Sequence, residues 1–221
     1  NISYEVFPFS FKELVRIREI GIEKHYTERE ISGIRKLLKG YLVFGSYPEI
    51  VVKGFERKIL EEYMNTIIYR DLVERWKIRN YKAVKLFLKL AVNSFSCKLS
   101  IKSMEGFIKN NGIDVSRNSL YNYLEYCNDA YILFPMRKFS FGIREMEQTF
   151  PKIYVIDNGI INLFSHRISE NVGRLMENLV FLELRRRYKE NENLFYFEHE
   201  NYEVDFVIKE NHKIKQLIQV T

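Results

Sequence analysis

The residues that could do chemistry gather in the last third of the chain. Glu177 lies on an apolar stripe of a predicted helix over 169–190, and Glu203 and Asp205 alternate with apolar residues in a predicted strand over 202–208. A carboxylate on an apolar face is costly unless it is paired, hydrogen-bonded or bound to a metal ion. Carboxylates on rigid elements suit Mg²⁺, which can orient water for attack on a phosphodiester. The pattern therefore predicts a metal-dependent nuclease centre with Glu177 and Asp205 as metal ligands; unrelated surface carboxylates are the alternative.

A second predicted strand, over 213–221, completes this candidate site. If the turn lies at 211–212, Asp205 is opposite Leu217, Glu203 is opposite Gln219, and Asp205 and Gln219 are diagonal neighbours on one face. Gln219 then offers a carbonyl oxygen, and a lysine on the same strand face would supply the cation that stabilises an oxyanion. The candidate catalytic residues are Glu177, Asp205, Gln219 and Lys215.

The basic residues of the chain concentrate elsewhere. The net charge is +6, and residues 75–103 contain eight basic side chains and no acidic one. Such a block suits a polyanion, because neutralising phosphates releases their condensed counterions. Solvated helix faces are the alternative interpretation. The candidate DNA contacts in this block lie along one face of a predicted helix over 81–95, and they are Lys82, Lys85 and Lys89.

Residues 80–145 carry the pattern of a winged helix-turn-helix. Predicted helices over 81–95, 100–110 and 117–127 are followed by a strand-like segment over 131–137. In that fold the third helix enters the major groove and the wing lies near the DNA backbone. The same fold also serves as a spacer between proteins, so DNA contact is one of two interpretations. The candidate DNA-contacting residues here are Arg117, Asn118, Tyr121 and Asn122 on the helix, and Arg137 and Lys138 in the wing.

The first part of the chain predicts small helices that do not make a domain by themselves. A strand is expected over 3–7, a helix begins after Ser10, and Thr27 opens a second helix with a capping box. A long amphipathic helix over 55–78 follows. Near its end Arg70 could reach a nucleotide phosphate on a neighbouring subunit, although a solvated charge network is the favoured interpretation. Residues 1–52 thus resemble the end of a domain whose body lies upstream, and both ends of the chain look cut.

The segments Gly173–Asn178, 203–207 and 217–221 resemble the C-terminal domain of unknown function DUF4143 of archaeal and bacterial AAA+ family ATPases, which is similar to PD-(D/E)xK restriction-endonuclease-like folds. Segments 4–11 and 41–49 look like those that close the ATPase core and open its lid. The resemblance implies a P-loop ATPase parent that binds ATP, an upstream ATPase domain as partner, and a possible oligomer. No GxxxxGK[ST] motif occurs here, so this chain is not expected to hydrolyse ATP alone.

The chain departs from the nuclease pattern at its last motif. A nuclease of this class carries Glu-x-Lys where this chain has Gln219-Val220-Thr221. Threonine cannot supply the missing cation, so the tail is expected to be a degenerate nuclease-like platform for docking DNA or protein. The alternatives are an active Mg²⁺-dependent endonuclease and a protein-interaction module that does not contact nucleic acid.

The expected fold class is mixed α+β. The expected order is an ATPase-core and lid segment (1–52), a connecting helix (53–79), a winged helix-turn-helix (80–145) and a small restriction-endonuclease-like α/β domain (150–221). No apolar run approaches the roughly 18 residues that would span a bilayer. A cytoplasmic location without membrane contact is therefore expected.

Overall fold

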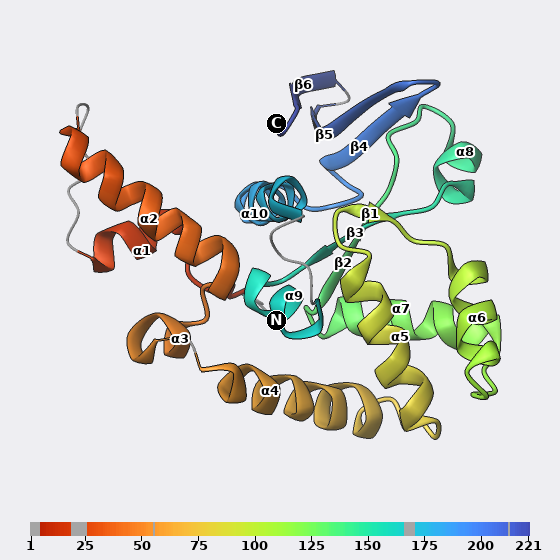
Figure 1. Ribbon diagram of the computed structural model, residues 1–221. Helices are drawn as coiled ribbons and strands as arrows, with labels where there is room; N and C mark the ends of the chain where they lie inside the picture. The colour runs from red at the N-terminus through yellow and green to blue at the C-terminus, as the bar shows by residue number, and fades with distance from the viewer. Residues whose placement is uncertain (1–4, 19–25, 55, 166–170, 212) are drawn as a thin grey trace.

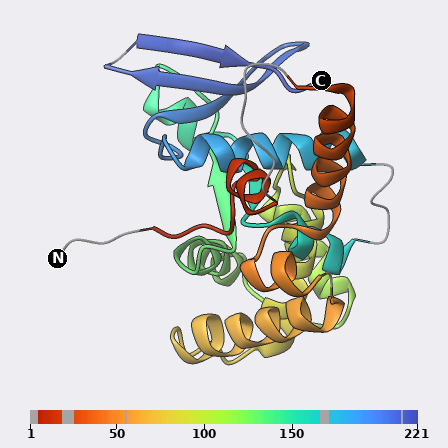
Figure 2. The same ribbon diagram turned by 90° about the vertical axis from the view of Figure 1, so that its left-hand side faces the viewer.

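The computed structural model describes residues 5–18, 26–54, 56–165, 171–211 and 213–221. Within these residues the chain forms ten α-helices, one π-helix and two three-stranded antiparallel sheets. The expected mixed α+β class is confirmed. The helices α1 to α3 project from one side of the molecule, and the second sheet lies on top of helix α10 (Figures 1 and 2). No helix in the described ranges is both long and apolar enough to cross a bilayer.

The N-terminal helices begin where the sequence places their caps. Helix α1 spans Phe11–Ile17 after the capping box of Ser10, and α2 spans Glu28–Phe44 after the capping box of Thr27. Helix α3, Pro48–Lys53, follows the turn at Gly45. The strand expected over 3–7 lies partly outside the described residues, and its described part, residues 5–7, has no strand structure.

The connecting helix changes its geometry half-way along. Helix α4 spans Arg57–Thr66 and continues without a break as a π-helix, η1, over Ile67–Glu74. Its buried residues Leu60, Met64 and Ile68 recur at a spacing of four. Trp76, just after η1, stacks on Tyr126 with ring centroids 4.1 Å apart. The connecting helix is thus packed on the next module.

The central module contains three helices and a three-stranded sheet. Its elements follow in the order α5 (Tyr81–Asn93), β1 (Cys97–Lys98), α6 (Ile101–Asn110), α7 (Arg117–Asp129), β2 (Leu133–Met136) and β3 (Lys152–Val155). The sheet order is β1-β3-β2, with both pairs antiparallel. Helix α8, Ile143–Gln148, lies in the connection between β2 and β3. That long insertion is why periodicity did not reveal β3 as a partner of β2.

The C-terminal part contains α9 (Asn158–Phe164), α10 (Val172–Arg185), β4 (Leu194–His199), β5 (Tyr202–Glu210) and β6 (Lys213–Ile218). The sheet order is β4-β5-β6. The predicted hairpin exists, but its predicted register is wrong. Phe206 pairs with Ile218 and Val207 with Leu217, two residues beyond the predicted partners. The pairs next to the turn already differ by one residue, and an irregularity between Ile208 and Lys209 adds the second. His212 of that turn lies outside the described residues.

One continuous apolar core runs from α1 to the second sheet. Tyr154 of β3 stacks on Phe181 of α10 with ring centroids 4.1 Å apart, and Phe206 of β5 lies 5.8 Å from Tyr154. All three side chains are fully buried. Burying large aromatic rings is the main stabilising contribution at this junction. The two sheets are therefore joined through α10 by aromatic packing.

A buried carboxylate ties the turn before α3 to the start of α9. Asp157 accepts hydrogen bonds from the Ser46 backbone N–H (2.7 Å) and the Gly159 N–H (2.7 Å). Burial raises the pKa of Asp157 to about 6, although these donors favour its charged form. Gly45 is held directly against this carboxylate, at φ +77°.

We expect Gly45→Ala to destabilise the protein by about 2–4 kcal/mol. An added Cβ would lie 1.8 Å from Asp157 Oδ1, and the positive φ disfavours any side chain. Urea unfolding followed by circular dichroism measures the loss. Gly33→Ala is the matched control, because its Cβ meets open space on a helix, and it should leave stability unchanged or raise it by up to about 1 kcal/mol. Equal stability of the two variants would contradict the expectation.

Candidate functional site

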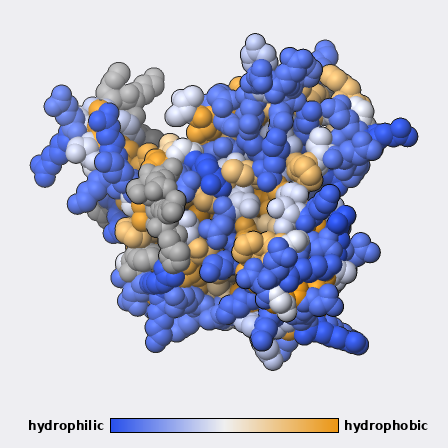
Figure 3. Space-filling view, turned by 45° about the vertical axis from the view of Figure 1, so that its right-hand side comes forward, coloured by the Kyte–Doolittle hydropathy of each residue, from blue (hydrophilic) through white to orange (hydrophobic). Residues whose placement is uncertain are grey.

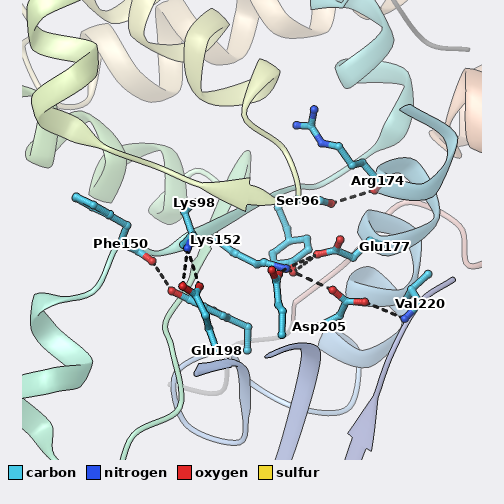
Figure 4. Close-up of polar contacts among 12 residues, drawn as sticks. Ser96, Lys98, Phe150, Lys152, Arg174, Glu177, Glu198, Asp205 and Val220 are labelled. Atoms are coloured by element: carbon cyan, nitrogen blue, oxygen red, sulfur yellow. Dashed lines mark hydrogen bonds and ion pairs between the residues drawn. The ribbon is translucent and has the colours of Figure 1, made fainter. Parts of the chain in front are cut away.

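Three carboxylates converge on one buried lysine between the two sheets (Figure 4). Lys152 is the first residue of β3, and its Nζ lies 3.2 Å from Glu177 Oε1 and 3.4 Å from Asp205 Oδ1. It also forms an ion pair with Glu203. We call these four residues the lysine cluster. Their ion pairs connect β3 of the first sheet, α10, and β5 of the second sheet.

Strand register places a second ion pair beside the cluster. Lys98 of β1 is directly opposite Lys152 of β3, and Glu198 of β4 is directly opposite Glu203 of β5. Lys98 Nζ lies 2.6 Å from Glu198 Oε2, so each cross-strand lysine pairs with one cross-strand glutamate. Like charges directly opposite one another on a single sheet repel. The contact between the sheets removes that repulsion on both sides.

Helix α10 is fixed to β3 beside Glu177. The side chain of Asn178 accepts a hydrogen bond from the Val155 N–H (2.8 Å) and donates one to the Val155 carbonyl (2.9 Å), as a neighbouring strand would. Asn178 is fully buried, so these bonds are strongly preferred over solvent contact. At the start of α10, the Arg174 carbonyl accepts a hydrogen bond from Ser96 Oγ at 3.0 Å. Glu177 therefore has a rigid backbone.

The environment of Glu177 opposes its charge. Burial raises its pKa, and the neighbouring Asp205 raises it further, whereas Lys152 and the hydroxyl of Tyr154 lower it. Tyr154 Oη donates a hydrogen bond of 2.7 Å to Glu177 Oε1. The pKa of Lys152 is raised, because the attraction of Glu177, Glu203 and Asp205 outweighs the effect of burial. The ammonium group is thus charged at neutral pH and holds the carboxylates together.

The structure brings together Glu177 and Asp205 but leaves the other two candidates apart. Asp205 Oδ2 accepts a hydrogen bond of 2.8 Å from the backbone N–H of Val220, and the side chain of Gln219 next to it is exposed. Lys215 Nζ lies 2.6 Å from Glu210 Oε1 and 3.4 Å from Tyr188 Oη. The cation nearest to the carboxylates is Lys152.

The donor set does not favour a bound metal ion in this arrangement. An ammonium group occupies the point on which Glu177 Oε1 and Asp205 Oδ1 converge. Across the described ranges, no group of three or more His, Cys, Asp or Glu side chains is arranged to hold a metal ion. The side chains of Lys152, Asp205 and Glu177 are only 5%, 7% and 12% exposed. Glu203 is the exposed member of the cluster, at 45%, so the cluster is a set of ion pairs that is buried on the side of Lys152, Asp205 and Glu177 and reaches the surface at Glu203.

Sequence reasoning missed Lys152 and found the carboxylates. A search for the missing cation within the last strand, where the nuclease motif has it, points to Lys215. The available signal was a lysine at the start of the apolar run Ile153–Ile156, because a lysine leading into a buried strand needs a partner. That signal does not identify the carboxylates with which the lysine pairs.

The lysine row of α5 stands free of acidic partners. Lys82, Lys85 and Lys89 are exposed, and no ion pair involves them within the part of the chain that the structure describes. Lys85 Nζ lies 5.8 Å from the centroid of the Tyr81 ring. We call these three residues the α5 lysine row. It is an accessible positive surface.

The basic residues expected on α7 and in the wing are already paired. Arg117 lies 2.9 Å from Glu105, Lys138 lies 2.9 Å from Glu145, and Arg137 forms an ion pair with Glu147. The polar candidates on α7 are exposed, namely Asn118, Tyr121 and Asn122. Arg70 contacts its neighbour Asp71 through two hydrogen bonds of 2.9 and 3.2 Å. Phosphate binding by any of these cations would compete with an existing carboxylate.

Two known families match most of the chain. Residues 35–170, more than half of the chain, match the family described as "Domain of unknown function (DUF8612)". The chain belongs to this family. Residues 172–220 match a second family, "Domain of unknown function (DUF4143)", so the resemblance seen in the C-terminal motifs is confirmed. The boundary between the two matches falls just before α10, and the lysine cluster spans it: Lys152 comes from the DUF8612 part and its partners from the DUF4143 part.

Two curated proteins are similar to this DUF8612 chain. "Uncharacterized protein MJ1544" of Methanocaldococcus jannaschii is 43% identical over 225 residues, which cover 100% of this chain and 49% of that protein. An "Uncharacterized protein" of Haemophilus influenzae is 19% identical over 188 residues, which cover 84% of this chain and 45% of that protein. The chain thus spans about half the length of the curated relatives it matches. No solved structure matches the chain significantly.

We expect Lys152→Met to destabilise the protein by about 3–5 kcal/mol at pH 7, since it leaves buried carboxylates without their cation. Without the ammonium, the pKa values of these carboxylates in the folded state rise above those in the unfolded chain. A carboxyl group whose pKa is higher in the folded than in the unfolded state destabilises the fold at pH values above its pKa in the unfolded state. The loss of stability should therefore shrink as the pH falls from 7 towards 4.5. Urea unfolding at pH 5 and pH 7 measures both effects.

Lys98→Met is the control for this experiment. Its ion pair with Glu198 is 44% exposed on the lysine side, so its removal should cost about 1 kcal/mol or less. If Lys152→Met loses no more stability than Lys98→Met at pH 7, the lysine cluster does not stabilise the contact between the two sheets.

Proposed function

We propose that this chain is the C-terminal region of an AAA+ type P-loop ATPase and that it docks the parent protein on DNA. The observation that carries the proposal is the α5 lysine row, a set of cations that is exposed on a helix of the central module and has no acidic partner among the described residues. The match to DUF4143 supports the connection with such ATPases, because the C-terminal motifs of this chain resemble the DUF4143 domain at the C-terminal end of AAA+ family ATPases. ATP would be bound by the upstream part of the parent, not by this chain.

The order of elements supports a winged helix-turn-helix in the central module. Helix, strand, two helices and two strands follow one another from α5 to β3, and the sheet order β1-β3-β2 places the short first strand at the edge. This order is similar to that of a winged helix, in which helices α6 and α7 would form the helix-turn-helix. Gly112, at φ +74°, provides the turn between them. On this proposal, residues 137–151, including α8, form the wing.

DNA contact in this proposal is mainly with phosphates. The α5 lysine row is free to bind them, and the exposed side chains of Asn118 and Asn122 at the start of α7 add neutral donors. Asn80 Nδ2 donates a hydrogen bond of 2.9 Å to the Asp114 carbonyl, which joins the start of α5 to the loop before α7. Phosphate contacts position a protein on DNA without selecting a sequence. The expected binding is therefore salt-dependent and weakly sequence-specific.

We expect the triple variant Lys82→Glu, Lys85→Glu, Lys89→Glu to lose binding to a DNA duplex. If all three lysines contact phosphates, the slope of log K against log salt concentration should fall by about 2.7. Fluorescence anisotropy of a labelled duplex at several salt concentrations measures both effects. The control, Lys12→Glu, Lys39→Glu, Lys213→Glu, changes the net charge equally on other elements and should retain most of the binding. Equal loss of DNA binding in both variants would show that only the net charge matters, and it would contradict a specific role of the α5 lysine row.

In this proposal the DUF4143 part is a degenerate nuclease-like platform, because the ammonium of Lys152 already pairs with its carboxylates. A second candidate function is Mg²⁺-dependent cleavage of a phosphodiester, and the convergence of Glu177 and Asp205 with a lysine favours it. It requires that the ammonium of Lys152 leave its present position. We expect no nicking of supercoiled DNA in 10 mM Mg²⁺ or Mn²⁺, about the usual assay range. Nicking that Asp205→Asn abolishes would instead establish the enzyme.

A further inference from the structure

A cleft of about 490 Å³ lies between α7 and the segment that leads into β3. Its volume is within the range of about 300–1,000 Å³ that is common for ligand sites. Helix α7 contributes Tyr121, Glu125 and Asn128, and residues 146–151 form the opposite wall. The cleft is separate from the lysine cluster and from the α5 lysine row. Its lining includes Tyr121 and part of the proposed wing, but the DNA docking proposed above rests on the α5 lysine row and does not use the cleft itself.

Part of the cleft lining is apolar or aromatic. Leu99, Ile101 and Leu124 contribute side chains that are almost fully buried. Tyr121 and Phe150 line the same space and are 51% and 52% exposed. Aromatic rings of this kind bind a cation over their faces, and an apolar lining accommodates an aliphatic stem.

The charge of the cleft is negative. Glu125 and Asp129 line it, and neither takes part in an ion pair within the residues that the structure describes. The third carboxylate, that of Glu147, is neutralised by Arg137. Two uncompensated carboxylates repel a phosphate backbone, so this part of α7 does not suit DNA. They attract a positively charged group instead.

We propose that this cleft binds an arginine side chain of a partner polypeptide. A guanidinium group can form charge-assisted hydrogen bonds with Glu125 and Asp129 while it stacks on Tyr121 or Phe150. Its aliphatic stem covers the apolar part of the lining. The requirement for both a cation and an apolar stem distinguishes this ligand from a free metal ion and from DNA. The proposal goes beyond DNA docking and does not depend on it.

The test uses the 221-residue chain and the peptide acetyl-Gly-Arg-Gly-amide as probe, with ¹H–¹⁵N NMR as readout. We expect saturable shifts confined to residues 121–129 and 146–151. The matching citrulline peptide has the same shape without the charge and should bind at least about tenfold more weakly, since a partly desolvated charge-assisted contact is lost. The variant Glu125→Gln, Asp129→Asn should lose the preference for arginine.

The control variant is Glu74→Gln, Glu200→Gln, which removes two exposed carboxylates elsewhere and should bind the arginine peptide as the unaltered chain does. Shifts that do not saturate, equal binding of the citrulline peptide, or unchanged binding by Glu125→Gln, Asp129→Asn would each overturn the proposal. So would displacement of the peptide by a DNA duplex that shifts the same residues. The comparison of the two peptides on the unaltered chain decides the question even if the cleft variant does not fold.

Discussion

The buried ammonium of Lys152 is the interaction on which the joining of the two sheets depends. It brings Glu177, Glu203 and Asp205, from a helix and a strand of the C-terminal part, against the first strand position of β3. Removing charges from water is expensive, so such a cluster forms only when every member finds a partner. The aromatic contacts of Tyr154 and Phe181 supply the apolar burial that offsets this cost.

The same arrangement explains how two family modules form one body. The DUF8612 part provides β1 and β3 with their two lysines, and the DUF4143 part provides β4, β5 and α10 with the carboxylates. Asn178 adds a direct connection, because it satisfies both backbone groups of Val155. An electrostatic contact and a hydrogen-bonded contact thus fix the orientation of α10. Glu177, Glu203 and Asp205 of the DUF4143 part thus belong to the contact between the two modules.

Charge is distributed so that different surfaces suit different partners. The α5 lysine row is exposed and unopposed, whereas the cations of α7 and of the following segment are neutralised by Glu105, Glu145 and Glu147. On the far part of α7, Glu125 and Asp129 have no cationic partner in the described part of the chain, and they lie beside exposed aromatic rings. One small module can therefore present a positive face and a negative cleft, because helix α7 and helix α5 place their polar residues on different surfaces. The fold separates the charges that the sequence places close together.

The sequence by itself determined the local elements and the types of residue available for chemistry. The capping boxes at Ser10 and Thr27, the three helices between 81 and 129, and the alternating strand with Asp205 follow from hydrogen bonding and periodicity over a few residues. Tertiary structure decided the rest. Lys152 meets Asp205 across 53 positions of sequence, and the pairing of β2 with β3 crosses an inserted helix, so neither contact leaves a local pattern. The β5–β6 register was likewise not encoded by periodicity, because the observed pairing differs from the predicted one by two residues, and a shift of two leaves every side chain on the same face of the sheet.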